Sequence, residues 1–210
     1  MPSDVESLAK PLKQGIVDLH LAIDSSAQAA LLDYLALLVK WNRIYNLTAV
    51  RDPRQMLGKH LLDSLSVLPY INGDELLDVG TGAGLPGVPL AIARPELAVT
   101  LLDSNSKKTR FLQQVKSQLG LDNVKVAHRR VEQFQPVEGF ATVTSRAFAS
   151  ILEFDAMCGR LCSAQGVVVA MLGQAPTHDE RESLGDRLLS LDSVEVPDVD
   201  GVRHIARIRP

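Results

Sequence analysis

One stretch near the middle of the chain, residues 76–87, constrains the fold most strongly. It reads as a short apolar strand that ends in an acid, Asp78, followed by a glycine-rich turn and a helix start at Pro86-Gly87. A second apolar strand follows, and it also ends in an acid, Asp103. Parallel α/β sheets hold adenosine-containing cofactors at the carboxyl ends of their strands with this arrangement. We therefore expect an α/β fold that binds such a cofactor.

The glycine-rich turn fits two cofactor loops. Residues 82–87 fit the dinucleotide pattern G-x-G-x-x-G, and residues 80–84 fit the looser G-x-G-x-G loop of S-adenosylmethionine (AdoMet) methyltransferases. Asp78 favours AdoMet, because a carboxylate repels a pyrophosphate but accepts hydrogen bonds from a methionine ammonium or its waters. Asp103 is expected to accept hydrogen bonds from ribose hydroxyls, which both cofactors carry.

The order of the expected elements is typical of an AdoMet methyltransferase. Five helix-linked strands are expected at residues 76–79, 98–103, 124–127, 141–145 and 166–171, and a closing hairpin at 193–196 and 202–209. Other helices are expected at residues 6–19, 27–45, 52–69, 107–119, 151–161 and 178–190. The pattern predicts a Rossmann-like class I fold with a seven-stranded, mostly parallel sheet and an antiparallel last strand.

Length and composition bound the remaining organisation. The chain has 210 residues, 46% of them hydrophobic, and we divide it into an N-terminal helical segment, residues 1–70, packed on an AdoMet-binding domain, residues 71–210. We see no apolar run of about 20 residues and no signal peptide, so we expect no membrane partner and a cytoplasmic location. Cys158 and Cys162 are expected in one helix as buried free thiols. We expect no metal site, and a monomer.

The net charge of −3 hides an uneven distribution. Residues 40–60 carry five Lys or Arg and one acid, and residues 105–130 carry seven and one. Residues 175–200 carry two arginines and eight acids. If the two basic stretches share a face, they form a phosphate-binding surface beside the cofactor, although single lysines in such stretches are more often solvated helix positions. This pattern raises RNA as a substrate.

Several segments together resemble one family. They are WNRIYNLTAV (residues 41–50), HLLDS (60–64), residues 78–89, 101–104, 107–112 and 130–132, and SRAF (145–148). From about residue 31 onward the chain is similar to the bacterial ribosomal RNA small subunit methyltransferase G family (RsmG, or GidB). The resemblance implies AdoMet-dependent methylation of N7 of a guanine in the decoding region of 16S rRNA, as naked RNA or as the small ribosomal subunit. Leu172-Gly173 departs from the Lys-Gly common in the family, so that basic contact is either missing or supplied by a residue such as Arg203.

The residues after the fourth strand agree with this chemistry. Guanine N7 has a free lone pair and no proton, so its methylation needs in-line placement and no general base. The motif Asn/Asp-Pro-Pro-Tyr/Phe, used on exocyclic amines, does not occur there. At Arg146 we favour a contact to a phosphate or to guanine O6 over a structural ion pair, because carboxyl ends of strands face the cofactor. Phe148 fits base stacking and core packing equally well.

The candidate site residues follow from these arguments and from the resemblance. Cofactor binding is expected from Asp78, Gly80, Thr81, Gly82, Gly84, Leu85, Asp103, Ser104, Val131, Glu132 and Arg146, and Arg146 is also the candidate catalytic residue. Substrate RNA contacts are expected from Arg43, Asn46, Thr48, His60, Lys107, Lys108, Arg110 and Phe148. Structural roles compete at some positions, with a packed or capping histidine at His60 and turn formers at Asn46 and Thr48.

Two other functions stay open on the sequence. A methyltransferase of a small molecule would show no salt-dependent RNA binding, and the paired basic stretches argue against it. A nicotinamide-dependent oxidoreductase, or a nonenzymatic nucleotide-binding module, would bind NAD. Asp78 and the closing hairpin argue against this second alternative.

Overall fold

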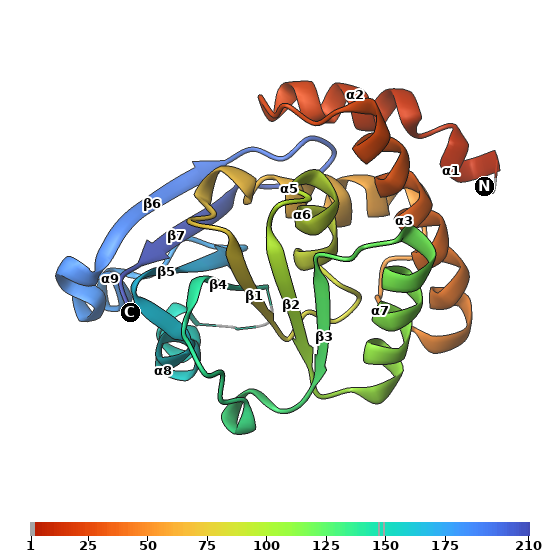
Figure 1. Cartoon of the computed structure of the whole chain (residues 1–210). Coiled ribbons are helices and arrows are strands. Elements are labelled where there is room, and N and C mark those ends of the chain that lie inside the picture. The colour runs from red at the N-terminus through yellow and green to blue at the C-terminus, as the bar shows by residue number, and fades with distance from the viewer. Residues whose placement is uncertain (1–2, 147, 149) are drawn as a thin grey trace.

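A computed structural model describes residues 3–146, 148 and 150–210 of the chain. Seven strands form a sheet in the order β3-β2-β1-β4-β5-β7-β6 (Figure 1). They are β1 (Glu75–Val79), β2 (Ala98–Asp103), β3 (Val124–His128), β4 (Phe140–Ser145), β5 (Cys162–Leu172), β6 (Leu188–Val194) and β7 (Arg203–Ile208). Strands β1 to β5 pair in parallel, and β7 runs antiparallel to both β5 and β6. The predicted α/β class, with a reversed last strand, is confirmed.

Helices cover both faces of this sheet (Figure 1). They are α1 (Ser3–Glu6), α2 (Ala9–Asp18), α3 (Ser25–Tyr45), α4 (Pro53–Met56), α5 (Asp63–Leu65), α6 (Gly87–Ala93), α7 (Ser106–Leu119), α8 (Ile151–Cys158) and α9 (His178–Leu184). A π-helical segment, η1 (Leu57–Leu62), joins α4 to α5, and short 3₁₀ turns are η2 (Leu68–Tyr70), η3 (Val131–Gln133), η4 (Gly159–Leu161) and η5 (Gly185–Arg187). The single helix expected over residues 52–69 is therefore divided into four pieces.

Side chains alternate between the two faces of the sheet, as strand geometry requires. Leu76 of β1 and Leu101 of β2 belong to the larger hydrophobic core, which also contains side chains of α1 to α7. Their neighbours Leu77 and Leu102 belong to a second core on the other face, under α8 and α9. Both faces of the central strands are thus buried, which is typical of a parallel sheet between helical layers.

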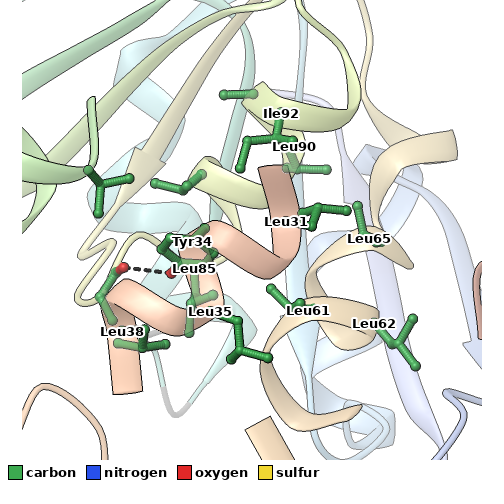
Figure 2. Packing of buried hydrophobic residues seen from close by; sticks show 14 of the residues in the cluster. Leu31, Tyr34, Leu35, Leu38, Leu61, Leu62, Leu65, Leu85, Leu90 and Ile92 are labelled. Atoms are coloured by element: carbon green, nitrogen blue, oxygen red, sulfur yellow. Dashed lines mark hydrogen bonds between the residues drawn. The ribbon is translucent and has the colours of Figure 1, made fainter. Parts of the chain in front are cut away.

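The N-terminal helices share the larger core with the sheet. Figure 2 shows Leu31, Leu35 and Leu38 of α3 close to leucines of η1 and α5. Tyr34 of the same helix is fully buried, and its hydroxyl donates a hydrogen bond of 2.7 Å to the Ala83 carbonyl in the glycine turn. Burying one leucine contributes roughly 1.5–3 kcal/mol. The packing of α3 therefore stabilises the glycine turn that Tyr34 contacts.

Several predicted elements have wrong bounds, and the strand expected at residues 193–196, for example, is β6, Leu188–Val194. The helix expected over residues 178–190 stops at Leu184, because Gly185 takes φ 52° and residues from Leu188 onward pair with β7. Cys162, expected in a helix with Cys158, instead begins β5. It lies at the amino end of that strand, across the sheet from the glycine turn, and burial raises the pKa of its thiol to about 11. Among the described residues, none of the helices combines the length and apolar character that a membrane span requires.

Candidate active site

The glycine turn is built around the carboxylate of Asp78 at the end of β1. Asp78 Oδ2 accepts hydrogen bonds from Thr81 Oγ1 at 2.6 Å and from Gly87 N at 2.8 Å. A Cβ at Gly87 would lie 2.8 Å from the same oxygen, so only glycine fits there. The pKa of Asp78 is raised to about 7 by burial, against the lowering effect of these two hydrogen bonds.

The other oxygen of this carboxylate is left for a ligand. Asp78 Oδ1 is buried and meets no hydrogen-bond partner within the described part of the chain. A buried acceptor without a partner costs free energy, so an ammonium group or a bridging water would be favourable there. This atom therefore fits the amino group of AdoMet.

Asp103, at the end of β2, is the second acid of the site and is only 6% exposed. Its Oδ2 accepts a hydrogen bond of 2.9 Å from Gly82 N, and its Oδ1 accepts one of 2.8 Å from Asn105 N. Lys108 Nζ lies 3.6 Å from Oδ2. A carboxylate accepts about four hydrogen bonds, so Asp103 keeps capacity for ribose hydroxyls.

A cavity of about 280 Å³, called the cofactor cleft below, opens beside these two strand ends. Expected site residues that line it are Gly80, Asp103, Ser104, Lys108, Val131, Glu132 and Phe148. Other lining residues are Val79, Leu102, Arg129 and Arg130. Arg129 is not among the site residues predicted from sequence, and its backbone N–H donates to the Asp103 carbonyl at 3.2 Å. The expected cofactor residues Asp78, Thr81, Gly82, Gly84 and Leu85 do not line the cleft but build the turn below it.

Phe148 packs against the second core and also lines the cofactor cleft. Its ring centroid lies 5.2 Å from that of Phe154, which belongs to the second core. Its neighbours Ala147 and Ala149 lie outside the described residues.

Arg146 follows β4 and lines a second cavity of about 330 Å³. The sequence favours a ligand contact over a structural ion pair here, and the structure shows an ion pair. Arg146 Nη1 donates to Asp63 Oδ2 at 2.8 Å and to the Lys59 carbonyl at 3.3 Å. The side chain of Arg146 is still 25% exposed. Asp63 has no role predicted from sequence, although it lies in the segment HLLDS.

His60, for which the sequence leaves open an RNA contact or a packed histidine, is buried and lines the same cavity as Arg146. His60 is 4% exposed within η1, and its Nε2 lies 2.9 Å from Thr48 Oγ1. Burial is the main reason that the pKa of His60 is lowered to about 4, so the ring is neutral near pH 7. A buried, neutral ring presents little surface to a polynucleotide.

Asn46 and Thr48 form the turn after α3, as their structural alternatives predict. Asn46 ends α3 with φ 49°, and its side-chain oxygen accepts a hydrogen bond from Arg51. The Thr48 N–H donates to Asn42 Oδ1 at 2.9 Å.

The remaining expected RNA residues lie along α3 and α7. Lys107 and Lys108 stand at the start of α7, beside the cofactor cleft, and Arg110 lines a hollow of about 310 Å³ with His128. Arg43 lines a groove of about 430 Å³ between α3 and the end of α7. The two helices pack through Trp41 and Phe111, with ring centroids 5.6 Å apart. Lys40 and Arg43 of the first basic stretch therefore lie beside the end of α7, which belongs to the second.

Fold and site together define a class of enzyme. Acids end β1 and β2 around a glycine turn, and β7 is reversed between β5 and β6. This arrangement is that of a class I AdoMet-dependent methyltransferase. The family model described as rRNA small subunit methyltransferase G (GidB) matches residues 27–206, and the chain belongs to this family.

Curated relatives and solved structures agree with this assignment. The ribosomal RNA small subunit methyltransferase G of Stutzerimonas stutzeri is 51% identical over 97% of this chain and 96% of its own length. The protein of the same name from Alkalilimnicola ehrlichii is 50% identical over 95% and 91%. Among solved structures, the magnesium protoporphyrin IX methyltransferase of Synechocystis PCC 6803 shares the fold with a TM-score of 0.60. It is 17% identical, over 85% of this chain and 98% of that one.

Proposed function

We propose that this protein transfers a methyl group from AdoMet to N7 of a guanine in the decoding region of 16S rRNA. The observation that carries this proposal is the pair of acids at the ends of β1 and β2, in a chain of the rRNA small subunit methyltransferase G family. The family supplies the substrate, and the acids supply the cofactor site. We further propose that the protein acts as a monomer in the cytoplasm and needs no metal ion.

The residues of the cofactor cleft, together with Asp78 in the turn below it, fit AdoMet. Asp78 Oδ1 would receive the amino group or its bridging water, and the free acceptor capacity of Asp103 would receive the ribose hydroxyls. Val131 and Glu132 would line the adenine side. AdoMet, when bound, supplies an electrophilic methyl group on a sulfonium.

Methylation at guanine N7 requires the protein to hold the base and exclude competing contacts, because no proton has to be removed. Two titratable groups near the site are consistent with a reaction that needs no general base. His60 is neutral and buried, and the Asp78 carboxylate is occupied in holding the glycine turn. Arg146 lines a cavity with a side chain that is 25% exposed, which suits a donor to guanine O6 or to an adjacent phosphate.

A labelling experiment tests the proposal. Tritiated AdoMet is incubated with the protein and with small ribosomal subunits from cells that lack this methylation, and the label is mapped by nuclease digestion. We expect label in one N7-methylguanosine of the small-subunit rRNA, and none with Asp103→Ala at the same AdoMet concentration. Unlabelled rRNA despite AdoMet binding in calorimetry would contradict the substrate and favour a small-molecule methyltransferase. Binding of NAD in place of AdoMet would contradict the cofactor.

A further inference from the structure

A single buried carboxylate holds two arginines that come from distant parts of the chain. Asp63, at the start of α5, has a side chain that is 7% exposed. Its Oδ2 accepts a hydrogen bond from Arg146 Nη1 at 2.8 Å, and its Oδ1 accepts one from Arg203 Nε at 2.8 Å. Arg146 follows β4 and Arg203 begins β7, so the trio joins three elements. Two positive charges therefore share one negative charge.

Both arginines line one cavity and keep donors that no described residue uses. Within the described residues, no hydrogen-bond partner contacts Nη1 or Nη2 of Arg203, or Nε or Nη2 of Arg146. The two side chains are 26% and 25% exposed, and both line the cavity of about 330 Å³. Lys59 and His204 line it as well, and Asp63 is the single acid among its lining residues. The cavity is therefore built for an anion.

We propose that Asp63, Arg146 and Arg203 form a phosphate clamp, in which the two arginines hold one backbone phosphate of the RNA substrate and Asp63 orients them. This inference rests on the proposed function for the identity of the RNA. The planar fork of a guanidinium matches two oxygens of a phosphate, and a fork that is already held in place loses less side-chain freedom on binding.

The position of the clamp suits a phosphate close to the methylated base. Arg146 lines the clamp cavity and Phe148, two residues further along the chain, lines the cofactor cleft. A nucleotide whose base enters between these cavities would place its own or a neighbouring phosphate against the clamp. Leu172 and Gly173 also line this cavity, and neither carries a charge that would compete with the arginines.

The first test compares two arginines at opposite ends of β7. Arg203→Gln removes a clamp donor, and Arg209→Gln removes the same charge from an exposed residue just after the strand, at the other edge of the sheet. Binding of a fluorescent stem-loop of small-subunit rRNA is measured by anisotropy over a range of salt concentrations. Arg203→Gln should weaken binding about tenfold and reduce the slope of log K against log salt by about 0.7–0.9. The AdoMet affinity should stay unchanged. Identical affinities and slopes for the two variants would overturn the clamp.

A second arm identifies the source of the phosphate. A methylphosphonate, which carries no charge, replaces one phosphate at a time around the target guanosine. At one position the wild type should lose more than tenfold in affinity, and Arg203→Gln should lose clearly less there, because one of the two arginine contacts is already missing. If no position is sensitive, while inorganic phosphate shifts the Arg203 Nε–H signal in NMR spectra, the site binds free phosphate and the RNA assignment is overturned.

Asp63 is a positioning residue in the clamp, and Asp63→Asn tests this role. The variant removes one negative charge and so raises the net charge of the protein by one. RNA affinity at low salt should therefore not fall. Turnover should fall at least tenfold, because the guanidinium groups lose their common anchor. A residue that only supports folding would lower the midpoint of unfolding without separating affinity from turnover. Unchanged turnover in a folded Asp63→Asn would overturn the positioning role.

Failure of the clamp and failure of the proposed function are distinguishable. RNA binding needs no methyl transfer, so the salt slopes of Arg203→Gln and Arg209→Gln judge the clamp by themselves. If the wild type labels no rRNA but Arg203→Gln still shows the reduced slope, the clamp stands and the proposed reaction is wrong.

Discussion

The cofactor cleft and the phosphate clamp lie on either side of the segment after β4, and the chain builds them in opposite ways. The cleft is lined mainly by short stretches at the ends of β1, β2 and β3. The clamp joins residues that are 83 and 140 positions apart. The acids also differ in use, since Asp78 and Asp103 keep acceptor capacity for a ligand, whereas both oxygens of Asp63 are taken by arginines. Local sequence thus encodes the cofactor site, and tertiary packing creates the clamp.

The largest expected effect is a pH dependence of stability that comes from Asp78, in the turn below the cleft. The usual pKa of Asp78 is 3.8, and burial raises it to about 7 in the folded protein. The folded state therefore binds more protons than the unfolded state between these values, and stability falls as pH rises through this window. His60 acts in the opposite direction between pH 4 and 6.5, because the pKa of its ring is lowered in the folded state.

Asp78→Asn isolates the first contribution. Between pH 5 and pH 8 the wild type should lose up to roughly 3 kcal/mol of unfolding free energy relative to the variant. Urea unfolding at both pH values measures this difference. Parallel pH curves for the two proteins would show that Asp78 does not titrate in this range.

Asp103→Ala should separate the two cavities in binding. Loss of hydrogen bonds from two ribose hydroxyls to a charged acceptor predicts AdoMet binding weaker by about 100-fold in calorimetry. The salt slope of RNA binding should stay that of the wild type, because the clamp is intact. Asp122→Ala, at an exposed acid after α7, is the matched control. An equal loss of RNA affinity would mean that the cavities are not independent.

Tyr34→Phe tests how firmly the floor of the cleft is held. The change leaves the buried Ala83 carbonyl without its hydroxyl donor, which should cost about 1–3 kcal/mol of stability. Thermal unfolding is the measurement, and Tyr45→Phe, at a residue that is 43% exposed, is the control. If the two variants have the same midpoint of thermal unfolding, the hydrogen bond makes no net contribution to stability.

Lys108→Gln should have the smallest effect. Lys108 is 35% exposed and 3.6 Å from Asp103, and ion pairs of this kind contribute about 0–1 kcal/mol. Arg203→Gln should destabilise the protein more, because it leaves the buried Asp63 with one partner fewer. Equal unfolding midpoints for the two variants would remove the energetic contrast between cleft and clamp.

Much of the fold and one half of the site could be predicted from sequence. Strands β1 and β2 were predictable because apolar runs end in acids beside glycines. Asp103 then lines the cofactor cleft, and Asp78 holds the turn below it. Asp63 gave no such signal, because an acid among leucines in a helical segment reads as a solvent-facing position. Only the approach of β4 and β7 to α5 gives it two partners. Similarly, residues 188–190 join a strand through pairing with β7, which no local pattern reveals.

The hydrogen bond from Tyr34 to Ala83 has a consequence for how the molecule opens. The amides of Gly84 and Leu85 donate to the Thr81 carbonyl within the same turn, directly in front of α3. Breaking the hydrogen bonds of these two amides requires α3 to move away from the turn. That movement would also expose to solvent the α3 leucines that pack against η1 and α5. We therefore expect these amides to exchange with deuterium at the slow rate of α3, as members of one cooperative unit. The boundary at residue 70 between the helical segment and the AdoMet-binding domain is therefore a boundary in sequence only. The glycine turn below the cofactor cleft should unfold only together with the N-terminal helices that pack against it.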